Sequence, residues 1–243
     1  MPSKPQRLFV TAKLEPGATV ALGRDQAHYL RNVLRLKQGD NLLLFNGRDG
    51  EWWAELGDAG KKEAQVRLDH QTRPQEAGPD LHYLFAPLKR ARLDYMVQKA
   101  TELGASALRP VITRHTVAER VKSERLIANA IEAAEQCGIL RVPEIREPEK
   151  LGKLLDGWDE GRRLIFADEQ APHVSPLEAL KTLTPGPLAV LIGPEGGFER
   201  EERAALVAKP FVLPISLGPR VMRADTAAVA ALALVNAVLG DWR

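Results

Sequence analysis

The sequence predicts an α/β protein in which a small β-rich domain precedes a larger domain built on a parallel sheet. Three observations support this prediction. Strand-like runs separated by turn signals fill residues 7–70, and apolar strands alternate with helical stripes from residue 81 onwards. Between these regions, residues 72–80 concentrate proline, glycine and polar side chains, as domain boundaries do. We therefore expect domains at residues 1–73 and 74–243.

The N-terminal pattern indicates short strands, tight turns and one short helix. Strands are expected at residues 7–10, 41–45 and 51–56, and the helix at residues 25–36. Asn46-Gly47 and Asp49-Gly50 are dipeptides typical of tight turns. Successive side chains of a strand point to opposite faces, so we expect one of Trp52 and Trp53 in the core and the other outside. An outward ring could also stack on a base.

The second region alternates strands and helices, the order that builds a parallel sheet. Strands are expected at residues 81–86, 107–112, 164–167, 187–192 and 211–217. The first helix carries one apolar stripe that ends at Gly104, and the second begins after Ser123 as a plausible N-cap. This second stripe includes Cys137, which we expect as a small core residue and not as a nucleophile.

The last expected helix, which ends at Leu239, is apolar on nearly every side. A helix of this kind is normally buried all round. In a small domain, an outer helix can reach such burial by packing against a second copy of the chain.

Basic side chains are concentrated in two segments, although the net charge is only +2. Residues 1–37 hold seven basic side chains against two acidic ones, and residues 89–125 hold nine against four. This segregation is a weak indication of a polyanionic partner. A solvated basic face without a partner explains it equally well.

The single cysteine and the short apolar segments exclude several classes of protein. One cysteine, Cys137, cannot form an internal disulfide or a cysteine-cluster metal site. The most apolar segment, residues 227–235, has nine residues, far fewer than the roughly 20 that span a bilayer. Residues 1–5 contain no apolar signal region. We expect a soluble cytoplasmic protein with no membrane partner and no metal.

Two consecutive strand–loop–helix units carry loops rich in glycine and proline. The loops are residues 193–197 (GPEGG) and residues 217–220 (LGPR). In an open parallel sheet both fall at the carboxyl ends of strands, where ligands bind. The sequence contains no P-loop motif, and no dinucleotide-binding fingerprint near the start of the domain. A class I methyltransferase would also carry its glycines after the first strand, so these loops indicate another kind of site.

The two loops carry a resemblance to a known family. Residues 191–198 (LIGPEGGF) and 217–227 (LGPRVMRADTA) resemble the paired C-terminal signatures of the RsmE family. Its members are SPOUT-superfamily methyltransferases that act on N3 of a uridine in 16S ribosomal RNA. Further segments that resemble the family's PUA-like N-terminal domain and its central helices are residues 7–10, 28–35, 98–104 and 133–137. The resemblance covers essentially the whole chain.

The chain departs from the family pattern at three positions. Asp225 stands where the family usually has a glutamate, which is a conservative change. Tyr29 stands where a second histidine is frequent. Ile139 stands where an arginine is usual, although Arg141 is close by in the sequence.

The resemblance implies a SPOUT-type parallel sheet with a C-terminal trefoil knot, a PUA-like N-terminal β-barrel and a homodimer with the site at its interface. It also implies S-adenosylmethionine as the methyl donor, with no metal. The residues implied to bind this cofactor are Leu191, Ile192, Gly193, Gly196, Gly197, Ser216, Leu217, Gly218, Val221, Met222 and Thr226. The glycines agree with this role because they let the backbone fold closely around a ligand.

Methyl transfer to uracil N3 requires close positioning of the reactants and removal of the N3 proton. Glu195 is the nearest carboxylate that could act as the base or orient the cofactor, and pairing with a helix N-terminus is its alternative role. Arg220 and Arg223 cannot be the base, but they could stabilise negative charge on the uracil oxygens. Their alternative role is ion pairing with Asp225 or with the partner subunit.

The expected substrate is 16S ribosomal RNA in the small ribosomal subunit. The residues expected to contact RNA are Arg7, His28, Arg31, Arg35, Lys89 and Arg90. Two alternative functions stay open at this point. One is a ribose methyltransferase of the same superfamily that acts on tRNA or 23S ribosomal RNA. The other is a non-catalytic basic RNA-binding module whose glycine loops are structural or hold only phosphate.

Overall fold

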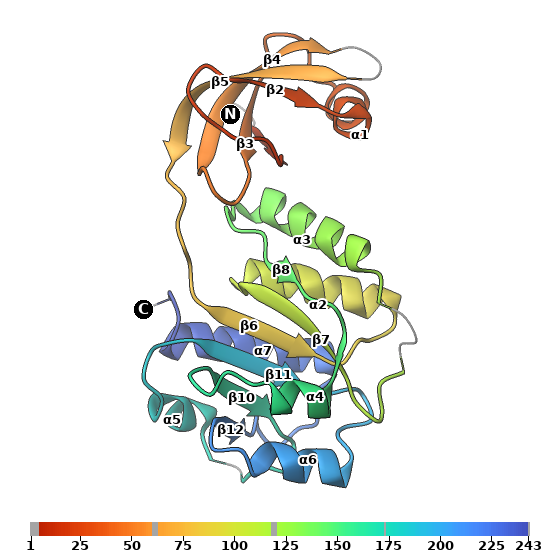
Figure 1. Ribbon diagram of the computed structural model, residues 1–243, viewed down its shortest axis with the longest axis vertical. Coiled ribbons are helices and arrows are strands. Elements are labelled where there is room, and N and C mark those ends of the chain that lie inside the picture. The colour runs from red at the N-terminus through yellow and green to blue at the C-terminus, as the bar shows by residue number, and fades with distance from the viewer. Residues whose placement is uncertain (1–4, 60–62, 118–120, 173, 243) are drawn as a thin grey trace. The chain divides into compact units, whose positions relative to one another are not determined.

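The computed structural model describes residues 5–59, 63–117, 121–172 and 174–242. These residues form two compact units (Figure 1). The first unit contains residues up to 77 together with residues 134–142, and the second contains residues 78–133 and 143–242. Residues 134–142 thus belong to the first unit, although the sequence pattern places them inside the second expected domain.

The first unit is built on a five-stranded sheet with the order β1-β3-β4-β5-β2 (Figure 1). Its strands are β1 (Gln6–Phe9), β2 (Thr19–Leu22), β3 (Asn41–Phe45), β4 (Glu51–Ala59) and β5 (Ala64–Arg73). β1 lies parallel to β3, and the other pairs are antiparallel. The three predicted strands are confirmed as β1, β3 and β4, whereas β2 and β5 were not predicted.

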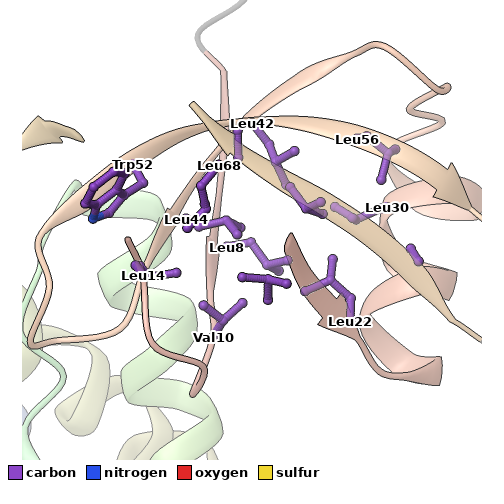
Figure 2. Packing of buried hydrophobic residues seen from close by; sticks show 14 of the residues in the cluster. Leu8, Val10, Leu14, Leu22, Leu30, Leu42, Leu44, Trp52, Leu56 and Leu68 are labelled. Atoms are coloured by element: carbon purple, nitrogen blue, oxygen red, sulfur yellow. The ribbon is translucent and has the colours of Figure 1, made fainter. Parts of the chain in front are cut away.

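Apolar side chains from all five strands fill one core, which Figure 2 shows at close range. Leu44 is fully buried in it. Trp52 also points into this core, and its indole Nε1 donates to the Asp49 carbonyl oxygen at 2.7 Å. Trp53 is half-buried and stacks on His70, with ring centroids 6.4 Å apart. The predicted alternation of the two tryptophans is therefore confirmed.

The predicted helix at residues 25–36 is shorter and less regular than expected. α1 (Arg24–His28) continues directly into a π-helical turn, η1 (Tyr29–Val33). Val33 is 59% exposed and leaves the predicted apolar stripe, whereas Leu30, Leu34 and Leu36 still contact the core of the first unit. Arg35 follows with a φ of 58° and is the only non-glycine residue in the described part of the chain with a positive φ. Both features are uncommon and occur often at functional sites.

Arg7 is buried inside the first unit, which corrects its predicted role. Its Nε lies 2.6 Å from the Glu51 carboxylate. The guanidinium also donates to the main-chain carbonyl oxygens of Ala134 and Ile139, the latter at 2.9 Å. Burial lowers the pKa of Arg7, and the hydrogen bond to Glu51 opposes this shift. A guanidinium enclosed in this way anchors the segment that follows Ala133 and is not available for the predicted RNA contact.

Cys137 is likewise not the core residue that its stripe predicts. It is the last residue of α3 (Ser123–Cys137), and its side chain is exposed. Gly138 follows with a φ of 72°, the left-handed conformation that commonly ends a helix. The core contacts at this point are made by Ala134 and Leu140 instead, because the chain turns after the helix end.

The second unit is built on a sheet with the order β12-β10-β11-β6-β7-β8, and β9 pairs with β7 (Figure 1). Its strands are β6 (Leu81–Phe85), β7 (Ala107–Ile112), β8 (Glu144–Ile145), β9 (Glu149–Lys150), β10 (Arg163–Ala167), β11 (Leu188–Ile192) and β12 (Val212–Ile215). All of these pairs are parallel. The predicted parallel sheet and its five main strands are confirmed.

Helices cover both faces of this sheet (Figure 1). They are α2 (Arg90–Glu102), α4 (Leu151–Asp156), α5 (Pro176–Lys181), α6 (Arg200–Val207) and α7 (Ala224–Val238), besides the first part of α3. One face carries α4 and α6 over a core that includes Leu84 and Phe166. α7 packs on the opposite face with α2 and α5.

α7 is only partly covered by the chain itself. Its fully buried side chains include Ala231, Leu232 and Val235, whereas Leu234 and Val238 are half-buried. Burial on all sides, as its composition predicts, is therefore incomplete within one copy. α7, like every other described helix, is too short or too polar to cross a membrane.

His82 of β6 should make the stability of the fold depend on pH. Its side chain is buried, and burial together with Arg162 and Arg146 lowers its pKa from 6.5 to about 4. Between these two pH values the unfolded chain binds a proton at this residue and the folded chain does not. Stability should therefore fall by at most about 3 kcal/mol as the pH drops through this interval.

Urea unfolding of wild type and His82→Phe across this pH range measures the effect. The phenylalanine keeps a ring in the buried position and removes the titrating group. The variant should lose less stability than wild type as the pH falls. The same pH dependence in both proteins would contradict the assignment.

Candidate functional site

A cavity of about 430 Å³ lies at the carboxyl ends of β10, β11 and β12, beside the start of α7. Each strand contributes the residues at and just beyond its end. The main lining segments are residues 166–170, 192–195, 197–198 and 217–224. This is the edge of the sheet where α/β proteins bind their ligands (Figure 1).

The strand register brings these three segments together. Phe166 of β10 is paired with Leu191 of β11, and Ala167 is paired with Ile215 of β12. Because the strands are parallel, the chain leaves all three at the same edge of the sheet. The predicted position of both glycine-rich loops at this edge is confirmed.

Most of the residues predicted to form the site line this cavity. The three catalytic candidates Glu195, Arg220 and Arg223 all do so. The cofactor candidates that line it are Ile192, Gly193, Gly197, Leu217, Gly218, Val221 and Met222. Four cofactor candidates do not line it, namely Leu191, Gly196, Ser216 and Thr226.

Each of these four residues has another environment. Leu191 is fully buried in the core of the sheet. A Cβ atom on Gly196 would lie 3.4 Å from the His115 side chain, so this residue faces the histidine. Ser216 is buried beneath its loop, and Thr226 is exposed on α7. The sequence motif identifies the loops correctly, but it does not specify which of their residues face the cavity.

Three glycines at the cavity could not be replaced without a change in local structure. A Cβ atom on Gly193 would lie only 2.4 Å from the Phe198 ring. Gly197 and Gly218 have φ angles of 69° and 107°, which side chains with a Cβ rarely adopt. The tight backbone of both loops therefore depends on these glycines.

His115 holds the first loop in place and was not predicted. Its Nδ1 lies 3.2 Å from the carbonyl oxygen of Gly196 and 3.1 Å from that of Gly197. Its Nε2 lies 3.2 Å from the Glu199 carboxylate. The imidazole therefore joins the carbonyl oxygens of the first loop to the side chain of Glu199, the N-cap residue of α6.

Glu195 pairs with Arg92 of α2 at the cavity. The N-terminus of α6 is closed by other residues, because Glu199 and Glu202 form a capping box there. The alternative prediction for Glu195, a partner of a helix N-terminus, is therefore wrong. Its carboxylate is instead oriented by a guanidinium from another helix.

Asp168 and Arg203 form an ion pair in the cavity wall that was not predicted from the sequence. Their closest N–O distance is 2.8 Å, and Asp168 is only 5% exposed. Hydrogen bonding to this carboxylate raises the pKa of Arg203. The one available signal was the acidic pair Asp168-Glu169 directly after an apolar strand.

Among the described residues, no group of three or more His, Cys, Asp or Glu side chains could hold a metal ion.

Arg220 and Arg223 are exposed at the cavity, on either side of Val221, which is 85% exposed. Within the described ranges neither arginine forms an ion pair. The Asp225 carboxylate accepts the main-chain N–H of Thr226 at 2.9 Å. The alternative prediction of a pair with Asp225 is therefore not found, and both guanidinium groups face solvent.

The other candidates for RNA contact are accessible to solvent. In the first unit, His28 and Arg35 are exposed and Arg31 is half-buried. In the second unit, Lys89 and Arg90 are exposed at the start of α2. Their accessibility agrees with a binding role and distinguishes them from the enclosed Arg7.

Two protein families match the chain. Residues 75–236 match a family described as RNA methyltransferase domain, and residues 22–69 match RNA methyltransferase PUA domain. A ribosomal RNA small subunit methyltransferase E from Rickettsia conorii is 35% identical over 236 residues, which is 96% of each protein. The protein of that name from Bacillus subtilis is 27% identical and covers 95% of this chain and 96% of its own length.

Two solved structures resemble the chain over almost its full length. One is a methyltransferase from Legionella pneumophila in complex with the cofactor SAM, with a TM-score of 0.87, 31% identity, and coverage of 98% of this chain and 99% of that one. The other is a ribosomal RNA small subunit methyltransferase E from Neisseria gonorrhoeae bound to S-adenosyl methionine. It has a TM-score of 0.87, 26% identity, and coverage of 98% and 100%.

Removal of the Arg203 guanidinium should destabilise the cavity wall. The Arg203→Met variant leaves the Asp168 carboxylate buried without its cation, and we expect a loss of about 1–3 kcal/mol because Arg203 is itself partly exposed. Urea unfolding measures this loss. Arg200→Met, which replaces an exposed arginine of the same helix, is the matched control. A double variant with Asp168→Asn should recover part of the stability, and a single variant as stable as the control would refute the pair's contribution.

Proposed function

The chain belongs to the ribosomal RNA small subunit methyltransferase E family, and on this premise we propose that it transfers a methyl group from S-adenosylmethionine to N3 of a uridine in 16S ribosomal RNA. The similarity that carries this proposal extends over 96% of the chain at 35% identity. Two structures similar to the whole chain contain bound S-adenosylmethionine. The proposal that N3 of uracil is the methylated atom rests on the resemblance of the two glycine loops to the signatures of this family.

The cavity fits the proposed cofactor in size and in chemistry. Its volume of about 430 Å³ lies in the range of small-molecule sites. Ile192, Leu217 and Met222 offer apolar contacts for an adenine ring, and the backbone of the glycine loops offers N–H and C=O groups. S-adenosylmethionine supplies, when bound, a methyl group on a positively charged sulfur. No metal takes part in this proposal.

The side chains at the cavity divide the remaining tasks. Arg220 and Arg223 present exposed guanidinium groups that can neutralise charge on the uracil oxygens as N3 loses its proton. Glu195 is the candidate to accept that proton or to orient the reactants, and Arg92 holds its carboxylate at the cavity. Burial of the reactants between the loops then supplies the close positioning that transfer needs.

We further propose the finer features that the family resemblance implies. These are a trefoil knot in the C-terminal backbone, closure of the N-terminal sheet into a PUA-like barrel, and a homodimer. The half-buried side chains Leu234 and Val238 of α7 support a dimer, because a second copy could cover them. In this proposal residues 1–73 bind RNA through His28, Arg31 and Arg35, and residues 74–243 carry the reaction.

The product nucleoside tests the proposed function. Unmodified small ribosomal subunits or naked 16S transcript should be incubated with the protein and S-adenosylmethionine, digested, and analysed by mass spectrometry. The expected product is N3-methyluridine. Parallel incubations use tRNA and 23S ribosomal RNA, and a 2′-O-methylated nucleoside from either would replace this proposal by that of a ribose methyltransferase. If the protein neither methylates RNA nor binds S-adenosylmethionine, the alternative of a non-catalytic RNA-binding module would be favoured.

A single substitution in the second loop should separate cofactor binding from RNA binding. Gly218→Ala puts a Cβ atom on a backbone with a φ of 107°, so the loop must move, and we expect S-adenosylmethionine to bind about tenfold more weakly or worse. Affinity for RNA should change little. Calorimetry and filter binding measure the two affinities.

Gly186→Ala is the matched control for this variant. Gly186 is exposed in the same unit, does not have a positive φ, and a Cβ atom there would meet nothing within 4 Å. Unchanged cofactor affinity in Gly218→Ala would contradict the cofactor site. An equal loss of cofactor and RNA binding would indicate a general structural role for the loop.

A further inference from the structure

A second cleft of about 470 Å³ lies beside β7, β9 and the start of α4, and none of its described lining residues lines the cavity at the glycine loops. Its charged lining residues are Arg109, Arg146, Lys150, Lys153, Glu147 and Glu149. We call it the basic cleft, because four of these six side chains are cationic. Neither the sequence motifs nor the proposed reaction uses any of them.

Arg109 has no hydrogen bond to a carboxylate among the described residues, and its charge is met only by a more distant carboxylate and an aromatic ring. Its side chain is 16% exposed, and the carboxylate paired with it, that of Glu149, lies 3.8 Å away, beyond hydrogen-bond distance. Its guanidinium lies over the Trp158 ring at 5.4 Å from the centroid. Burial and the nearby Arg146 lower the pKa of Arg109. An anion in the cleft would relieve this unfavourable environment.

Arg146 and His82 each keep a buried nitrogen atom without a partner. The Arg146 Nε and the His82 Nδ1 are buried and have no hydrogen-bond partner among the described residues. The carboxylate of Glu144 pairs with Arg146 at 3.3 Å, through a different nitrogen of the guanidinium. Buried polar atoms are normally satisfied, so an unpaired guanidinium Nε beside the cleft indicates a missing acceptor.

The two acidic residues of the cleft are already engaged. Glu149 lies between Arg109, at 3.8 Å, and Lys153, at 3.5 Å. Glu147 accepts a hydrogen bond from the Ser123 hydroxyl at 3.0 Å. They therefore offset only part of the local positive charge. Lys153, whose side chain is 81% exposed, extends this charge to the rim.

We propose that the basic cleft binds a phosphate group of the RNA backbone. Arg109 and Arg146 present planar forks of N–H donors, which suit phosphate oxygens, and Lys150 and Lys153 add charge at the rim. A contact to a phosphate carries no sequence information, so the cleft would position the RNA without selecting its sequence. The inference rests on the proposed function in taking RNA as the substrate, and it adds a contact surface on the methyltransferase unit.

The salt dependence of RNA binding tests this proposal. The probe is a 16S transcript, and the variants are Arg146→Gln and the rim pair Lys150→Gln/Lys153→Gln. The rim pair replaces only exposed side chains, so it keeps the test valid if Arg146→Gln does not fold. The control is Lys181→Gln/Lys209→Gln, which removes the same charge elsewhere on this unit.

Each cleft variant should weaken RNA binding several-fold at about 0.1 M salt. It should also flatten the slope of log K against log[salt] by about 0.7 for each RNA phosphate that is no longer neutralised. The affinity for S-adenosylmethionine should stay the same, and the control should behave as wild type. An unchanged slope in the rim pair would overturn the proposal. Inorganic phosphate titrated into the same variants is a second probe. Loss of phosphate binding with RNA affinity intact would also overturn the proposal and would indicate a site for a small anion.

Methylation by wild type, measured in the same samples, separates this proposal from the proposed function. RNA that binds through the cleft but is never methylated would refute the proposed function alone. If wild type methylates the RNA, and the cleft variants bind RNA with unchanged affinity and salt dependence, only the proposed phosphate contact in the cleft is refuted.

Discussion

The parallel pairing of β10 with both β11 and β12 is the constraint on which the candidate site depends. β10 lies between the other two strands, and all three run in the same direction. The chain therefore leaves them at one edge, and their following loops share one cavity. If one of these strands were antiparallel, its loop would lie at the opposite edge of the sheet. The loops can adopt their geometry because Gly193 leaves room for the Phe198 ring, and because Gly197 and Gly218 take positive φ angles.

Polar side chains from neighbouring elements hold these irregular loops in place. His115 contacts the carbonyl oxygens of the first loop, and Arg92 pairs with Glu195 within it. The pair of Asp168 with Arg203 supports the wall contributed by β10. Loops that lack regular hydrogen bonding need such support to keep one geometry, and a site that must align two reactants depends on that geometry.

Charge in the sequence does not translate directly into a binding surface, because folding assigns many basic residues to internal partners. Arg7 neutralises Glu51 inside the first unit, and Arg125 pairs with Asp94 in the second. Arg220 and Arg223 are exposed at the cavity. The basic cleft shows the reverse case, since Arg109 is largely buried and is still poorly compensated. The partners of each basic residue, and not the net charge of its segment, decide where an RNA can bind.

The sequence by itself determined the alternation of the main strands and helices in the second unit, the parallel sheet, the two glycine loops and the family. It could do so because apolar periodicity and glycine motifs are local properties, readable over a few neighbouring residues. Only the tertiary structure decided that His115 clamps a loop 81 residues away, that Arg203 pairs with Asp168 across 35 residues, and that Arg7 is enclosed. Such contacts join side chains that are distant in the chain, so no local pattern specifies them. The location of the cavity was thus predictable from the sequence, whereas the side chains that stabilise its loops were not.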